Sequence, residues 1–210
     1  MLAGVLTAVL VSGGTSTAKA QPTRKDLTAA MLSLRQVRDA FGTGWSPLAL
    51  TGSGDPFCPQ FTLAEPSRSV DALYSTVEGD DGAGAAFYEV IASFDSATDA
   101  DKYYEQEKAI SENCSKSEGH FGTTPVTYEI TDITREADAV GHEVIAARYE
   151  ARPTDGSSTE VVLIGYIVET KMERLVLATN YYVFSEPTET EIEDYYDLTK
   201  VAFDKAAAAL

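Results

Sequence analysis

Three pairs of adjacent tyrosines are the residues of this 210-residue sequence whose spacing best suits recognition chemistry. The pairs are Tyr103-Tyr104, Tyr181-Tyr182 and Tyr195-Tyr196. Adjacent side chains point to opposite faces of a strand, or diverge by about 100° on a helix, so one tyrosine can pack while the other stays accessible. A phenol ring with an apolar body and a polar tip suits ligand clefts and interfaces. We therefore predict a groove between helix and sheet lined by Tyr104, Tyr182 and Tyr196; ordinary packing is the alternative.

Cys58 and Cys114 are the two cysteines of the sequence. An even number of cysteines in an exported chain favours a disulfide. The bridge would tie an irregular segment to the end of a helix, and loop-closure entropy would contribute about 4 kcal/mol to stability. Two buried free thiols are the alternative, and no Cys-x-x-Cys or Cys/His spacing indicates a metal site.

Local signatures of catalysis are absent from the sequence. His120 and His142 lack the H-x-x-H or H-E-x-x-H spacing of zinc sites, and no G-x-S-x-G nucleophile motif occurs. Glu78, Asp80 and Asp81 could ligate Ca²⁺, but their spacing is not that of an EF-hand, and a solvated turn is the favoured interpretation. With 33 acidic residues some close carboxylate pair is inevitable, so their abundance does not indicate a glycosidase. We predict a non-enzymatic protein without a metal or cofactor.

Residues 1–20 have the pattern of an export signal. An apolar run from Leu2 to Val11 is followed by small residues and by Ala18-Lys19-Ala20, an A-x-A cleavage pattern. The run is too short to span a bilayer, which takes about 20 apolar residues. A buried apolar N-terminal helix or strand is the alternative. We expect residues 21–29 to form a flexible leader after cleavage.

The same segment resembles a degenerate lipoprotein signal. Residues 10–13, Leu-Val-Ser-Gly, are similar to those before the lipidated cysteine of bacterial lipoproteins, but Gly14 stands where that cysteine would be. Without a thiol no lipid can be attached there. We therefore expect an extracytoplasmic protein, secreted or associated with the cell envelope, whose mature chain is not stably inserted in a membrane.

The formal net charge is −17 at pH 7. Such a surface repels phosphate backbones and anionic lipids, which argues against nucleic-acid binding and peripheral membrane docking. The acidic residues are spread along the sequence and do not form one block. Solubility outside the cell explains this charge, and a specific cationic partner is the alternative.

The predicted sheet is organised around residues 141–184, where three runs rich in Val, Ile, Leu and Tyr follow one another. Asp155-Gly156 parts the first two runs, and this step suits a hairpin turn because it tolerates positive φ. Three further strands are expected at residues 69–77, 85–94 and 126–133, and helices at residues 34–41, 96–113 and from 188 onward. Residues 30–210 are thus predicted to form a single α+β domain. Its antiparallel sheet of about six strands would be covered by helices, in the order αββαββββα.

A family resemblance rests on two stretches around the central helix. Phe94-Asp95-Ser96-Ala97-Thr98-Asp99-Ala100 and Ser111-Glu112-Asn113-Cys114 resemble the strand, helix and cysteine pattern of the PknH-like extracellular sensor domain family. Members lie outside mycobacterial receptor Ser/Thr kinases or occur as secreted and lipid-anchored proteins of actinobacteria. The resemblance implies a non-enzymatic domain with a broad cleft for an unidentified extracellular ligand. Members often carry more than one disulfide, whereas this sequence has cysteines for one.

Three functions from different classes remain open at this point. The first is an extracytoplasmic ligand-binding or sensor-like domain of the actinobacterial cell envelope, with a small molecule or an envelope protein as partner. Because the sequence holds no kinase domain, a free-standing binding protein is the version we expect. The second is a protein-protein interaction module of the envelope, and the third is an unrecognised hydrolase.

Overall fold

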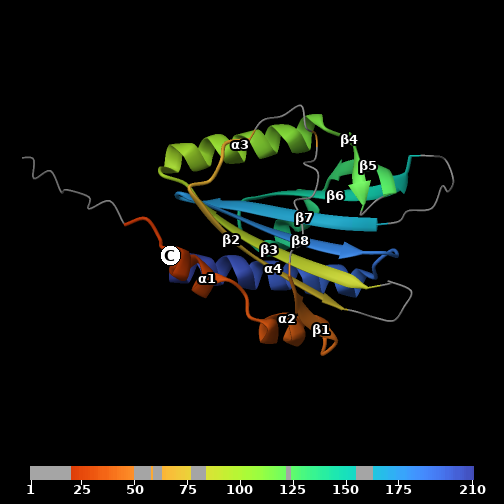
Figure 1. Cartoon of the computed structure of the whole chain (residues 1–210), viewed down its shortest axis with the longest axis horizontal. Coiled ribbons are helices and arrows are strands. Elements are labelled where there is room, and N and C mark those ends of the chain that lie inside the picture. The colour runs from red at the N-terminus through yellow and green to blue at the C-terminus, as the bar shows by residue number, and fades with distance from the viewer. Residues whose placement is uncertain (1–19, 50–57, 59–62, 77–83, 122–123, 155–162) are drawn as a thin grey trace, which may run out of the picture.

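The computed structural model describes residues 20–210, apart from residues 50–57, 59–62, 77–83, 122–123 and 155–162. In this part of the chain a single antiparallel sheet carries helices on both faces, as Figure 1 shows. The predicted α+β class is therefore confirmed. Outside the described residues lie most of the predicted export signal, the Asp155-Gly156 turn and the acidic turn with Glu78, Asp80 and Asp81.

The sheet has eight strands among the described residues, in the order β1-β2-β3-β8-β7-β6-β5-β4. They are β1 (Trp45–Leu48), β2 (Arg68–Thr76), β3 (Ala85–Ser93), β4 (Lys116–Phe121), β5 (Thr124–Asp132), β6 (Val144–Pro153), β7 (Leu163–Met172) and β8 (Leu175–Val183). The predicted meander is present, because β6 pairs with β7 and β7 pairs with β8. Pairing of β3 with β8 then joins the early hairpin to this meander in the centre of the sheet.

The expectation of about six strands in the order αββαββββα is wrong, because the sheet has two further strands at its edges and the order of elements changes with them. β1 contains Pro47 and lies in a segment rich in glycine and proline, which predicts a loop; proline is tolerated here because β1 is an edge strand. β4 is the other edge and is polar, with the sequence KSEGHF. Edge strands are often short and charged, which protects the sheet from pairing with other chains but also erases the apolar pattern that prediction requires.

Four α-helices and one 3-10 helix lie among the described residues: α1 (Arg24–Ala30), α2 (Leu34–Phe41), α3 (Ala97–Asn113), η1 (Glu136–Val140) and α4 (Glu189–Ala209). The capping box of Ser33 and Gln36 begins α2 as predicted, and Thr188 with Glu191 begins α4 in the same way. Helix α1 replaces part of the predicted flexible leader. It begins at a capping box that the sequence interpretation missed, and it buries Leu27 and Ala30.

Helices α1, α2 and α4 cover one face of the sheet, and α3 is the helix that crosses the other face in the described part of the chain (Figure 1). Because side chains alternate along a strand, Phe87, Val168 and Leu177 point toward the layer of α1, α2 and α4. There they are buried with Tyr195 and Phe203 of α4. The opposite face carries smaller apolar clusters beneath and beside α3. The main core therefore lies between the sheet and α4.

The predicted disulfide is present in the structure. Cys58 and Cys114 are bonded across a sequence separation of 56 residues, with their Cα atoms 6.3 Å apart. Both are buried, and they pack with Ile110 at the end of α3. Among the described residues, no helix combines the length and the apolar character needed to cross a bilayer.

Candidate functional site

The structure does not bring Tyr104, Tyr182 and Tyr196 together in one groove. Tyr104 lies on α3, where it borders a hollow of about 220 Å³ next to β6. Tyr182 lies on β8 and faces the α3 side of the sheet, with its ring 6.1 Å from that of Tyr149. Tyr196 belongs to α4 and is buried in the main core on the opposite side. A ligand-binding role for each of these residues stays a prediction.

Tyr181, the sequence neighbour of Tyr182, lines a different hollow, which we call the aromatic groove. It has a volume of about 440 Å³ and lies where the ends of β1, β3 and β8 meet the start of α4. The residues that matter for its chemistry are Phe41, Trp45, Tyr181, Phe184, Glu191 and Asp194. A volume in this range is typical of sites for small molecules.

One wall of the aromatic groove is a ladder of stacked rings. Trp45 stacks on Phe41 at 5.0 Å between ring centroids, and Phe41 stacks on Tyr181 at 5.3 Å. Tyr181 in turn stacks on the buried Tyr195 at 5.6 Å. The ladder is thus an extension of the main core: Trp45 and Tyr181 are only 3% and 2% exposed, and Phe41 is partly buried between them. The rings therefore form a rigid wall of which only a small part borders the groove.

Local structure explains why Trp45 reaches this ladder. Helix α2 ends at Gly42, whose φ of 99° reverses the chain direction, and β1 follows at once. The Arg38 Nε then donates a hydrogen bond to the Trp45 carbonyl at 2.8 Å. This hydrogen bond ties the start of β1 to α2, so Trp45 is held beside Phe41.

Two carboxyl groups face the aromatic wall from the first turns of α4. The Glu191 Oε2 accepts hydrogen bonds from the Thr188 amide at 2.7 Å and from the Thr188 hydroxyl at 2.8 Å. Asp194 follows one turn later and is partly buried. Burial, and then the nearness of Glu191 and Asp194, raises the pKa of the Tyr181 hydroxyl. The aromatic groove therefore combines an electron-rich wall with negative charge.

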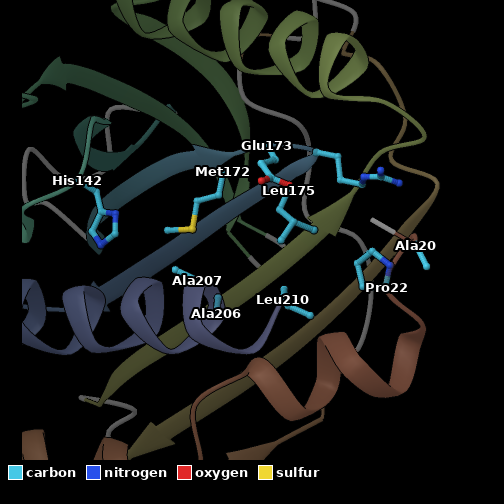
Figure 2. A pocket seen from close by; sticks show the side chains of 10 residues that line it. Ala20, Pro22, His142, Met172, Glu173, Leu175, Ala206, Ala207 and Leu210 are labelled. Carbon is cyan, nitrogen blue, oxygen red and sulfur yellow. The ribbon is translucent and has the colours of Figure 1, made fainter. Parts of the chain in front are cut away.

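Another hollow, shown in Figure 2, lies beside the C-terminal end of α4 and has a volume of about 360 Å³. Figure 2 places His142 and Met172 on one side and Pro22 and Ala20 on the other. The His142 Nε2 lies 2.9 Å from Asp204 Oδ1. We assign no ligand to this hollow, because one wall contains Ala20, which the predicted cleavage removes.

The sequence interpretation found Tyr181 only as part of a pair and missed the other residues of the aromatic groove. Trp45 is the single tryptophan, and Glu191 is recognisable from the sequence only as part of a capping box with Thr188. Their meeting depends on the pairing of β3 with β8 and of β1 with β2, which no local pattern encodes. Within the described residues, no group of three or more His, Cys, Asp or Glu side chains is placed to hold a metal ion.

Comparison with known proteins gives a likeness in fold. No protein-family model and no curated protein matches the sequence. The crystal structure of the extracellular domain of PknH from Mycobacterium tuberculosis matches with a TM-score of 0.55 and 10% identity, over 90% of this chain and 98% of that chain. The two chains share a fold. At this identity the likeness establishes no activity and no ligand.

A second crystal structure, of a protein from Bacteroides thetaiotaomicron VPI-5482, matches with a TM-score of 0.30 and 13% identity. The match covers 72% of this chain and 39% of that one. At that TM-score the likeness carries no structural argument. The extracellular domain of PknH is therefore the comparison that supports the fold.

Proposed function

We propose that this protein is a non-enzymatic, extracytoplasmic ligand-binding domain of sensor type, and that the aromatic groove binds a small organic cation. The fold shared with an extracellular domain and the disulfide support the location. The observation that carries the ligand class is the stacked ladder of Trp45, Phe41 and Tyr181 facing Glu191 and Asp194.

Cations are attracted to the negative face of an aromatic ring, and a carboxylate adds a direct charge interaction that is stronger at the partly buried Asp194 than at the exposed Glu191. An anionic ligand would meet repulsion from both acids and from the formal net charge of −17. A neutral ligand would gain from the rings but would leave the negative charge of the two carboxylates uncompensated. An organic cation interacts favourably with both the aromatic wall and the carboxyl groups of the groove.

The single tryptophan offers a direct test, because fluorescence of the protein reports on the groove itself. We expect tetramethylammonium to change Trp45 fluorescence saturably, and tert-butanol, a neutral molecule of similar shape, to bind more weakly. Asp194→Asn should raise the Kd about fivefold, which corresponds to about 1 kcal/mol for one partly buried charge interaction.

Asp197→Asn is the matched control, because Asp197 is exposed on the same helix and does not line the groove. Equal affinities of the Asp194 and Asp197 variants would contradict the proposal, as would equal binding of the neutral molecule. If a basic peptide bound the groove while tetramethylammonium did not, the protein-interaction function would replace the small-molecule function.

A further inference from the structure

A further hollow, which we call the α3 seam pocket, lies between α3 and strands β5, β6 and β7. Its volume is about 80 Å³, and it is open on one side. The walls include four isoleucines, one from α3 and one from each strand, and two carboxyl groups; these residues are Ile110, Ile130, Ile145, Ile167, Glu107 and Glu169. The α3 seam pocket is lined by aliphatic side chains and two carboxyl groups, whereas the aromatic groove is lined by rings and lies on the other side of the sheet.

Glu169 is an unusual residue for the centre of a sheet. It lies on β7, two residues after Ile167, so its side chain faces α3 and not solvent. Only 6% of its surface is exposed. Its Oε1 is buried without a hydrogen-bond partner among the described residues. Buried polar atoms are normally paired, so this oxygen leaves an unused acceptor at the pocket.

Glu107 supplies the second carboxyl group, from α3. Burial raises the pKa of both acids, and the nearness of Glu107 adds to the rise at Glu169. The Tyr103 hydroxyl forms a hydrogen bond with Glu107, which opposes the rise there. Two carboxyl groups in one apolar site oppose each other's ionisation, which favours a state in which the pair holds one shared proton.

The other charged or titratable groups around the pair do not neutralise it. From α3 come the hydroxyls of Tyr103 and Tyr104, and Glu143 stands just before β6. Lys171, two residues beyond Glu169 on the same face of β7, forms an ion pair with Asp101 of α3. The position beside Glu169 therefore suits a cation that comes from outside the chain.

We propose that the α3 seam pocket binds the end of a short alkylammonium, with its alkyl part against the isoleucines and its ammonium group donating to Glu169 and Glu107. The volume of about 80 Å³ is several times the roughly 10–15 Å³ that one water needs on the same measure, so the pocket admits only a few heavy atoms. On binding, the shared proton leaves to solvent and the ammonium hydrogens replace it. The overall exchange is one cation bound for one proton released.

The proposed exchange makes binding depend on pH with a definite sign. Where the free pair holds its proton, the Kd for the ammonium falls up to tenfold for each unit of rising pH. Above the raised pKa of the pair the dependence ends. The probe itself stays protonated over this range, since an alkylamine of the lysine type has a pKa of about 10.4.

The experiment is a titration with n-butylammonium from pH 5 to 9, followed by isoleucine methyl NMR and by calorimetry in two buffers of different ionisation enthalpy. We expect saturable shifts at Ile145 and Ile167, release of up to one proton, and weaker binding of 1-butanol. Glu169→Gln should weaken binding at least tenfold and remove the proton release. Glu107→Gln tests the same exchange in case the Glu169 variant does not fold.

Glu105→Gln is the matched control, because Glu105 is exposed on α3 and does not line the pocket. Absence of saturable binding, equal binding of 1-butanol, or binding without proton release would overturn the proposal. Asp194→Asn should leave this binding unchanged while it weakens tetramethylammonium binding. The two proposals can therefore fail separately.

Discussion

Among individual residues, Glu89 is the clearest case of a charge placed where charge is costly. It lies on β3, is 1% exposed and faces the layer of α1, α2 and α4. Its Oε2 accepts a hydrogen bond from the Leu32 amide at 2.8 Å, whereas its Oε1 is buried without a partner among the described residues. Burial raises its pKa to about 7, against the opposing effects of the Leu32 amide and of Lys205.

The pKa of Glu89 predicts how stability changes with pH. Between its usual value of 4.5 and about 7 the folded state binds more protons than the unfolded state, so stability falls as pH rises. At about 1.4 kcal/mol per unit, this component reaches about 3 kcal/mol. Urea unfolding at pH 4.5, 5.5, 7 and 8 should show that loss in the wild type and a flatter profile in Glu89→Gln. Parallel profiles would contradict this account of Glu89.

At the scale of elements, a close approach between two strands requires a glycine. Gly165 on β7 pairs directly with Tyr149 on β6, whose buried ring lies over it. A Cβ at position 165 would lie 1.9 Å from the Tyr149 Cζ and 2.2 Å from its Oη. Because this ring is enclosed, it cannot move aside freely.

Gly165→Ala should therefore lower the free energy of unfolding by about 1–3 kcal/mol, the usual cost of forcing extra volume into a packed core. Adding Tyr149→Leu should recover part of the loss by removing the ring that clashes. Gly44→Ala is the control, since the nearest atom to its new Cβ would be 3.9 Å away. Chemical denaturation compares the wild type, the two alanine variants and the double variant. Equal stabilities of the two alanine variants would contradict the explanation.

The elements also show how far sequence reasoning extends. The β6-β7-β8 meander is rich in Val, Ile, Leu and Tyr, and α2 and α4 carry capping boxes, so their local patterns suffice. The edge strands β1 and β4 lack such patterns because one face or edge meets water. For the tyrosine pairs, the sequence shows only that the two adjacent side chains point in different directions. Which side of the sheet α3 or α4 covers is set by long-range packing, and that decided where Tyr104 and Tyr196 lie.

On the scale of the whole molecule, the Cys58–Cys114 bond connects the segment between β1 and β2 to the end of α3, on the far side of the sheet from α4. Its sulfurs pack with Ile110, which also lines the α3 seam pocket. The bond therefore has two consequences. It restricts the unfolded chain, and it holds one wall of that pocket in the folded chain.

Replacing both cysteines by serine should separate these consequences. Loop-closure entropy for 56 residues predicts a loss of about 4 kcal/mol in the free energy of unfolding, seen as a lower urea midpoint. Hydrogen exchange should rise most in the last turns of α3, because the bond holds that end. Binding of tetramethylammonium should stay unchanged, since the aromatic groove is built by β1, α2, β8 and α4. An unchanged midpoint would contradict a stabilising bridge. Loss of the groove together with the pocket would mean that the two faces of the sheet are coupled.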